Sequence, residues 1–389
     1  YVGIGGQSIH SVKNSIVKEL PLDCIVSQDM VNELMDTNRS MEYKDCEILD
    51  AITQEYNVDG HYEDDPVGIQ ARHLEGNFLN VLWRRSFYRN LNKSLDNSGI
   101  KVAEMYLAPL TMADCVLTDA EKRAGCVLVD LGADTTTVSV YYRNKLRHIA
   151  VLPLGGSNVT KDLESLQIDE INAEAMKLKH ASALTNEKDI DADATLPIGD
   201  GRTIPSRMFI QVVEARMLEI VENVKYLVPH EFADKLLGGI VLTGGGSNMK
   251  NVEKLFHEVF DVEKVRIAKS TTLNINKKDS DVILSEDGTT NTILGLLAKG
   301  DMNCAGRAIS GSLFDEEVEP DSENTVTLDP TLAATGTQPA AQTTAQPAAN
   351  AEEEEEEKAP EPHKPTKFSR FFGSLKKFGS SIFEPDVNE

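Results

Sequence analysis

Two glycine-rich turns, each placed directly after a short apolar strand-like run, constrain the fold of this chain more than any other feature. The first turn follows Val127–Val129 and reads Asp130-Leu-Gly-Ala-Asp-Thr-Thr-Thr137. The second follows Gly239–Leu242 and reads Thr243-Gly-Gly-Gly-Ser-Asn248, about 110 residues later. Because β-branched and aromatic residues continue from the first turn to Tyr142, the sequence predicts a β-hairpin around Gly132.

Helical patterns surround these predicted strands. Apolar residues recur at helical spacing over Met249–Phe260, directly after the second turn, and again over Arg207–Leu227. A shorter helix is predicted over Asp169–His180. Strands that alternate with helices between residue 1 and about residue 310 predict an α/β or α+β architecture.

The first turn has the residue types of a phosphate and magnesium site. Backbone N–H groups and threonine hydroxyls donate to phosphate oxygens, Gly132 lets the backbone approach a ligand, and the Asp130 carboxylate suits the water shell of Mg²⁺. The alternative is a plain hairpin turn in which Gly132 takes a positive φ.

The second turn suits a nucleoside. Three consecutive glycines, Gly244, Gly245 and Gly246, let the backbone lie flat against a base or ribose, and the start of the following helix favours anions. The alternative is a bare strand-to-helix turn without a ligand.

Composition changes sharply after about residue 310. Residues 313–366 carry fourteen acidic side chains against Lys358 and Lys364, which accounts for about half of the net charge of −24. Residues 331–350 are mostly Ala, Thr, Gln and Pro, and Glu352–Glu357 is an unbroken acidic run. Such a segment cannot bury enough apolar surface to offset its chain entropy, so we expect residues 311–366 to form a disordered acidic linker.

Charge and cysteine usage exclude several classes of protein. Only the last residues offer a clustered basic face, so we expect no nucleic acid partner. The five cysteines are scattered and never form C-x-x-C, which argues against a disulfide framework and a zinc site and fits a reducing cytoplasm. No run approaches the ~20 apolar residues of a membrane span.

Residues 367–384 have the pattern of a helix that lies on a membrane surface. One helical face is rich in phenylalanine, the rest carries Lys, Arg and Ser, and no acidic residue occurs before Glu384. The alternatives are a helix that docks on its own domain or enters a protein groove. The predicted membrane contacts are Phe368, Phe371, Phe372, Leu375, Lys376, Lys377, Phe378, Ile382 and Phe383.

The two turns, in this order and spacing, resemble those of the actin–Hsp70–sugar kinase ATPase superfamily. Further segments resemble the FtsA family of bacterial cell division proteins across essentially all of residues 1–300 and the terminal helix. These segments are Gly5-Gly-Gln-Ser-Ile-His-Ser-Val-Lys-Asn-Ser15, Gln54-Glu-Tyr, Pro66-Val-Gly, Leu146-Arg-His, Ala173-Glu-Ala-Met-Lys177, Gly239-Ile-Val-Leu-Thr-Gly-Gly and Thr292-Ile-Leu-Gly-Leu-Leu.

This resemblance implies an actin-like (ribonuclease H-like) ATPase fold of the α/β class with an FtsA-type 1C subdomain. The implied subdomains are 1C at 1–75, part of 1A at 76–122, 2A at 123–165 and 238–310, and 2B at 166–237. Members of the family bind ATP, polymerise, and hold the C-terminal tail of FtsZ. They are peripheral proteins on the cytoplasmic face of the bacterial inner membrane at the division site, and 1C recruits later division proteins.

The expected cofactors are therefore ATP and Mg²⁺. The resemblance implies that Asp130 holds Mg²⁺ through water and that the first turn contacts phosphate through Gly132, Thr135 and Thr136. It places Glu174 and Lys177 at the ribose and adenine, although such a pair is also an ordinary i, i+3 surface pair. Gly244, Gly245 and Gly246 complete the adenosine side.

Departures from the family pattern bear on catalysis. Asp134 stands where the family commonly has a third glycine, and Thr137 stands where it has a final acid. A threonine cannot act as a general base, so we expect at most a slow ATPase in which the nucleotide is mainly an assembly ligand. The resemblance also places the start of this sequence after the strand and turn that form the family's first phosphate-binding loop.

Three other functions are alternatives for a chain with this pattern. A sugar kinase requires a base beside the acceptor hydroxyl, and none is evident; an Hsp70-like protein requires a β-rich domain after residue 310. An actin-like pilus assembly scaffold is the third alternative. For the acid-containing FtsZ tail, Arg207, Arg216 and Lys225 on the predicted helix are candidate contacts.

Overall fold

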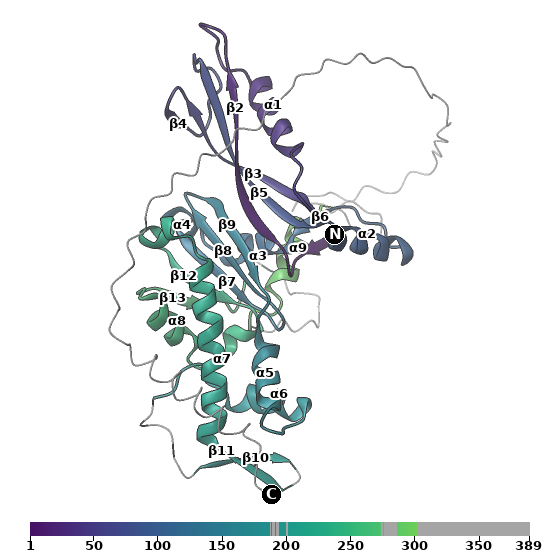
Figure 1. Ribbon diagram of the computed structural model, residues 1–389, viewed down its shortest axis with the longest axis vertical. Helices are drawn as coiled ribbons and strands as arrows, with labels where there is room; N and C mark the ends of the chain where they lie inside the picture. The colour runs from purple at the N-terminus through teal and green to yellow at the C-terminus, as the bar shows by residue number, and fades with distance from the viewer. Residues whose placement is uncertain are drawn as a thin grey trace, which may run out of the picture. The chain divides into compact units, whose positions relative to one another are not determined.

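The computed structural model describes residues 1–186, 188, 191, 194–199, 201–273, 275 and 286–301 (Figure 1). The chain divides into two compact units, Tyr1–Asp315 and Glu316–Glu389, and every described residue belongs to the first. The predicted linker at 311–366 and the predicted membrane helix at 367–384, with its nine proposed lipid contacts, lie outside the described residues.

A mixed sheet runs through the described residues in the order β13-β12-β7-β8-β9-β2-β5-β3-β4. In its first half, β7, β8 and β9 form an antiparallel meander, and β12 lies between β7 and β13 and is parallel to both. Because β7 and β12 are buried on both faces, they are almost continuously apolar. The bounds are β7 (Cys126–Leu131), β8 (Thr136–Tyr142), β9 (Lys145–Leu152), β12 (Gly239–Thr243) and β13 (Val265–Ile267).

The second half of the sheet joins the first through one residue pair, His10 with Ala150. Beyond this pair β2 continues along β5, and β3 and β4 complete an antiparallel sheet. Helix α1 (Gln28–Arg39) covers one face, where Leu34 and Phe78 are buried in a small core. The bounds are β2 (His10–Glu19), β3 (Cys46–Val58), β4 (His61–Glu63) and β5 (His73–Arg84).

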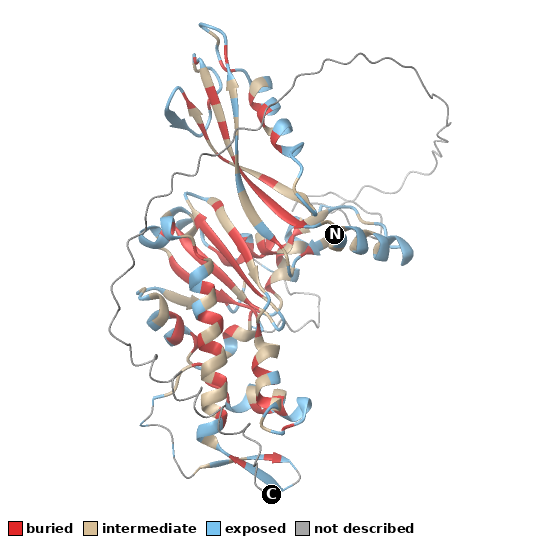
Figure 2. Cartoon of the chain, viewed as in Figure 1, coloured by how far each residue is buried: buried red, intermediate tan, exposed pale blue. Residues whose placement is uncertain are grey.

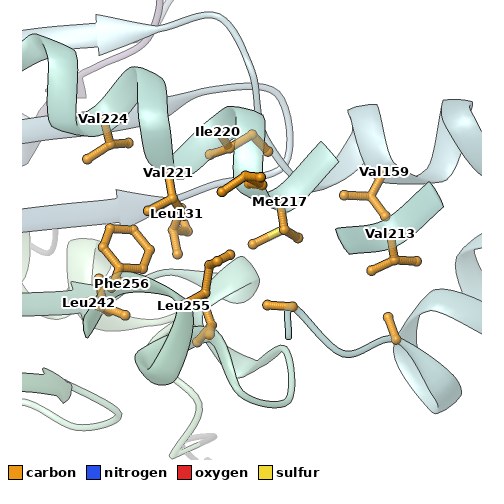
Figure 3. Close-up of a cluster of buried hydrophobic side chains, with 14 of the residues drawn as sticks. Leu131, Val159, Val213, Met217, Ile220, Val221, Val224, Leu242, Leu255 and Phe256 are labelled. Atoms are coloured by element: carbon orange, nitrogen blue, oxygen red, sulfur yellow. The ribbon is translucent and has the colours of Figure 1, made fainter. Parts of the chain in front are cut away.

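Helix α7 (Ser206–Leu227) supplies much of the main core. Its apolar side chains recur at helical spacing and are buried in one cluster with side chains of β7, β12, α5 and α8 (Figures 2 and 3). Each fully buried side chain of this kind contributes about 1.5–3 kcal/mol. The other elements around this cluster are α5 (Gly156–Glu164), α6 (Glu170–His180), β10 (Thr195–Gly199), β11 (Arg202–Pro205) and α8 (Val252–Phe260).

The remaining elements flank the sheet. Helix α9 lies so close to α3 that a Cβ on Gly295 would be 2.5 Å from the Thr111 carbonyl oxygen, and β1 pairs with β6 in parallel. These elements are β1 (Val2–Ile4), α2 (Arg85–Asn97), β6 (Met105–Leu107), α3 (Ala108–Val116), α4 (Asp119–Ala124), η2 (His230–Lys235), η3 (Gly245–Asn248) and α9 (Asn291–Lys299).

The predicted hairpin and the predicted helices over Asp169–His180 and Arg207–Leu227 are confirmed as β7–β8, α6 and α7. The helix predicted from Met249 begins later, at Val252, because Gly245–Asn248 forms a separate 3₁₀ turn. The subdomain bounds at 1–75, 76–122, 123–165 with 238–310, and 166–237 stay a prediction.

Candidate functional site

The two glycine turns meet at one edge of the sheet. Strands β7 and β12 are parallel neighbours with Asp130 opposite Thr243, so the turns that follow them leave the sheet side by side. Gly244 has φ +81°, and a Cβ on it would be 2.3 Å from the Asp130 carboxylate. Glycine is therefore required at this position by the approach of the turn to Asp130 and by its backbone conformation.

Asp130 has a carboxylate without a donor. Within the described residues, no side chain or backbone N–H donates a hydrogen bond to it, and no cation pairs with it. Burial raises the pKa of its carboxyl to about 6 because the charged form loses water and gains nothing in return. A cation beside this carboxylate would restore the charged form, so the surroundings of Asp130 fit a hydrated metal ion.

The first turn is closed by its own backbone. The Gly132 N–H donates to the Thr135 carbonyl over 3.0 Å, and a Cβ on Gly132 would be 2.7 Å from that same oxygen. Gly132 does not have a positive φ, so the left-handed glycine expected in the hairpin alternative is wrong, although the hairpin itself is present as β7–β8. The need for glycine here comes from close packing.

Thr136 does not belong to the open surface of the turn. Its side chain is fully buried and its hydroxyl donates to the Leu154 carbonyl over 2.8 Å. Because this donor is already engaged within the protein, we leave Thr136 out of the proposed phosphate contacts. Thr135 is partly exposed, Asp134 is exposed, and Thr137 is buried on β8 opposite Asp130.

Helix α5 begins against the first turn, a contact that the sequence analysis missed. The Gly156 N–H donates to the Gly132 carbonyl over 3.0 Å, and the Ser157 N–H donates to the Ala133 carbonyl over 2.8 Å. A Cβ on Gly155 would be 2.4 Å from the Ala133 oxygen. Gly155 and Gly156, the two adjacent glycines that follow β9, were the sequence signal that could have identified the start of α5 as a third segment of the site.

Glu174 and Lys177 lie on α6 and contact the beginning of α5, the end that packs against the first turn. The Lys177 ammonium donates to the Gly156 carbonyl and to the Thr160 hydroxyl, each over 3.0 Å, and contacts Glu174 over 2.6 Å. Only 12% of the Lys177 side chain is exposed, against 44% for Glu174, so the lysine of this i, i+3 pair lies inside the protein and the glutamate lies at the surface. Burial raises the pKa of Glu174, but the hydrogen bonds from Lys177 and Thr160 outweigh it and hold that pKa below its usual value.

The second turn contains one glycine whose side-chain space is open. Gly246 packs on Leu131, where a Cβ would be 3.0 Å from the backbone oxygen, and Gly244 packs on Asp130 as described above. At Gly245 the nearest atom to a Cβ is the Thr289 methyl at 3.7 Å, and its φ is not positive. Packing and backbone conformation therefore explain the outer two glycines and leave Gly245 unexplained.

A loop distant in sequence supports this turn. The Asn248 side chain donates to the Asp287 carbonyl over 2.7 Å. The buried Asn291 side chain donates to the Thr243 hydroxyl over 3.0 Å and to the Ala268 carbonyl over 2.9 Å. No local pattern in the sequence marked residues 286–291 as part of the site.

Two of the three candidate contacts for an acidic peptide are engaged elsewhere. Arg216 binds Asp162 with two hydrogen bonds of 2.5 and 2.9 Å and also contacts Glu219. Lys225 donates to the Val259 carbonyl over 2.8 Å.

Over the part of the chain that the structure describes, no helix is both long enough and apolar enough to cross a bilayer.

Comparison with known proteins gives one consistent family. The family model described as "Cell division protein FtsA" matches residues 127–285, and the one described as "SHS2 domain inserted in FTSA" matches residues 6–82. The cell division protein FtsA of Porphyromonas gingivalis is 32% identical over 284 residues, which cover 70% of this chain and 59% of that protein. The FtsA of Neisseria meningitidis is 30% identical over 268 residues, which cover 67% and 64%.

The chain thus spans about three fifths of the length of these curated relatives. Among solved structures, the PilM–PilN type IV pilus biogenesis complex has a TM-score of 0.47 and 14% identity, over 74% of this chain and 76% of that chain. A likeness of this size does not bear on function.

Proposed function

This chain belongs to the FtsA family of cell division proteins and has the actin-like α/β fold of that family, and from this premise we propose that it is an ATP-binding scaffold. In this proposal the scaffold polymerises and ties the FtsZ ring to the cytoplasmic face of the bacterial inner membrane. The nucleotide acts mainly as a ligand that permits assembly.

One observation carries the nucleotide part of this proposal. Two glycine turns lie side by side at the ends of the parallel strands β7 and β12, with the donor-free Asp130 carboxylate beside them. The space over Gly245 is open. A flat ligand that carries both phosphates and a hydrated cation suits this arrangement, because the Thr135 hydroxyl would donate to a phosphate and the carboxylate would accept from the metal's water.

The proposed roles follow from these positions. The Thr135 hydroxyl contacts phosphate beside Gly132, whose own N–H already donates to the Thr135 carbonyl. Asp130 holds the water shell of Mg²⁺, which would neutralise phosphate charge when bound. The open face of Gly245 lies against the nucleoside. Glu174 engages Lys177 and Thr160 through its Oε2 atom, which leaves Oε1 for a ribose hydroxyl.

Slow turnover is part of the same proposal. Thr137 is buried opposite Asp130 and has a hydroxyl in place of a carboxylate. A hydroxyl of ordinary pKa does not accept a proton from water at neutral pH, so this chain offers no base at that position.

Membrane attachment and partners are proposed from family membership and from the sequence of residues 367–384. The phenylalanine face would enter the lipid interface, and Lys376 and Lys377 would favour anionic lipid. We also propose self-association into filaments, binding of the FtsZ C-terminal tail, and recruitment of later division proteins through the 1C subdomain.

Calorimetric titration of the purified full-length protein with ATP tests the nucleotide proposal. We expect saturable binding that requires Mg²⁺ and is lost in Asp130→Ala, because the metal would no longer be held. A matched control is Asp119→Ala, which removes a carboxylate from the first turn of α4. Binding that is absent in the unmodified protein, or unchanged in Asp130→Ala, contradicts the assignment.

A further inference from the structure

A groove of about 360 Å³ lies between the two halves of the sheet, away from the glycine turns. One wall is the face of β2, β3 and β5, which presents the polar side chains of Ser15, Gln54 and Asn77. The other wall is formed by the β8–β9 turn, β9 and η2, with the rings of Tyr142 and Phe232. None of these residues takes part in the proposed nucleotide site.

The groove has an excess of positive charge in a protein that is strongly acidic overall. Its two acidic side chains already have partners, since Lys13 contacts Glu231 and Arg147 lies 3.8 Å from Glu55. Two further cations, Arg143 and Lys235, are exposed at the groove. Neither forms an ion pair or a side-chain hydrogen bond with any other described residue. The nearby acid Asp64 interacts electrostatically with Arg143, but its carboxylate binds Lys145, so both cations can meet a ligand.

Aromatic rings hold these two cations at the groove. The Arg143 guanidinium lies 5.4 Å from the centroid of the Tyr142 ring. The Lys235 ammonium lies 6.0 Å from that ring and 5.6 Å from the Phe232 ring. Cation–π contacts of this kind fix a cation without neutralising it, so both side chains stay available to an anion.

The groove opens onto a strand edge. β9 pairs with β2 only at His10, and the two strands then diverge (Figure 1). The Ser11 hydroxyl still binds the Ile149 backbone of β9. Along residues 12–19, β5 is the one strand partner of β2 within the described part of the chain. An edge of this kind presents backbone donors and acceptors to which an extended peptide can add as a further strand.

From these observations we propose that the groove binds an extended acidic segment of a partner protein. Its carboxylates meet Arg143 and Lys235, and its backbone runs along the open edge of β2. A small anion would use the two cations but not the strand edge. A nucleic acid strand is disfavoured, because tight binding to phosphates requires many more neutralised charges than two.

The probe is a fluorescent eight-residue peptide of alternating Glu and Thr, whose four carboxylates share one face when it is extended. Fluorescence polarisation with the full-length protein is expected to show saturable binding that weakens as salt is raised. A Lys and Thr peptide of the same length is expected not to bind. A Glu and Pro peptide has the same charge but half the N–H groups, so we expect it to bind at least fivefold more weakly.

The variant Arg143→Glu/Lys235→Glu is expected to weaken binding of the Glu and Thr peptide at least tenfold. The matched control, Lys44→Glu/Lys93→Glu, makes the same change in net charge at two exposed lysines of other surfaces and is expected to change affinity less than twofold. Circular dichroism of each variant monitors the fold. Hydrogen exchange supplies a second readout, because amides within residues 12–19 are expected to exchange more slowly when the peptide is bound.

Each contrary result overturns a named part of the inference. Absence of binding at millimolar peptide, or equal weakening in both double variants, shows that no acidic-peptide site exists here. Equal affinity for the Glu and Pro peptide, or unchanged exchange over residues 12–19, removes the strand edge from the site. Displacement of the peptide by equimolar inorganic phosphate shows a small-anion site instead. None of these results depends on ATP binding, so the inference and the nucleotide proposal are tested separately.

Discussion

The substitution Gly245→Asp separates ligand binding from folding at the second glycine turn. A Cβ on Gly245 would meet no atom closer than the Thr289 methyl at 3.7 Å, and the residue does not have a positive φ. A Cβ therefore fits at this position with ordinary van der Waals contact and without backbone strain. It occupies the open space in which we place the nucleoside, so the variant is expected to fold and to lose ATP binding.

The expected size of the effect comes from charge as well as volume. If the new carboxylate comes within about 6 Å of a phosphate charge, at an effective dielectric constant of about 20, the two charges repel each other by about 3 kcal/mol. This energy corresponds to a loss of more than a hundredfold in affinity. The same substitution changes the free energy of unfolding by less than about 1 kcal/mol, because replacement of an unstrained glycine is close to neutral.

Two neighbouring variants calibrate this result. Gly245→Ala adds a methyl group without charge, so we expect ATP affinity to change only a few-fold. Gly244→Ala places a Cβ 2.3 Å from the Asp130 carboxylate at a φ of +81°, and we expect the free energy of unfolding to fall by about 2 kcal/mol or more. Calorimetric titration and denaturant unfolding measure the two quantities. ATP affinity of Gly245→Asp within threefold of the unmodified protein refutes the placement of the nucleoside.

Other expectations concern turnover, pH and membranes. Phosphate release by full-length protein should be well below 1 s⁻¹, the lower end of ordinary enzyme turnover. A rate of about 1 s⁻¹ or faster contradicts the proposal that the nucleotide acts mainly as a ligand for assembly. Asp130→Asn should raise the free energy of unfolding by about 2 kcal/mol at pH 8 but not at pH 4. The pKa of the Asp130 carboxyl is raised from 3.8 to about 6 in the folded protein, so this group stabilises the fold at pH values below 3.8, and the stabilisation is lost as the pH rises through 6. An equal gain in the free energy of unfolding at pH 8 and at pH 4 contradicts this reasoning. Phe371→Asp/Phe372→Asp should abolish liposome flotation, whereas Lys376→Gln/Lys377→Gln should weaken binding to anionic vesicles alone; a floating Asp variant excludes the helix as the anchor.

Local sequence patterns were sufficient for the two strands that precede the glycine turns and for α7. The apolar runs before both glycine turns predicted β7 and β12, and the helical spacing over Arg207–Leu227 predicted α7, because each of these elements is buried in the main core. The pairing of the two turns was predicted only through the family resemblance. Neither apolar run, taken by itself, predicts that β7 and β12 are parallel neighbours.

Contacts between distant segments were not predictable in the same way. Thr136 has the right residue type and position for a phosphate contact, but the fold buries its hydroxyl against the Leu154 carbonyl. Lys177 is held by a carbonyl and a hydroxyl of α5. The support of the second turn by Asn248 and Asn291 joins residues that lie 39 and 48 positions from their partners. Such contacts depend on tertiary packing, for which single-sequence patterns carry no signal.

Flotation with purified FtsZ tests the proposed membrane scaffold most directly. Liposomes that contain anionic lipid are mixed with full-length protein, FtsZ, ATP and Mg²⁺, and are then floated through a density gradient. We predict that FtsZ rises with the liposomes only when the protein and its nucleotide are both present, and that FtsZ lacking its C-terminal tail stays at the bottom. FtsZ that remains at the bottom in the complete mixture, while the protein itself floats, would contradict the proposal that this chain ties FtsZ to the membrane.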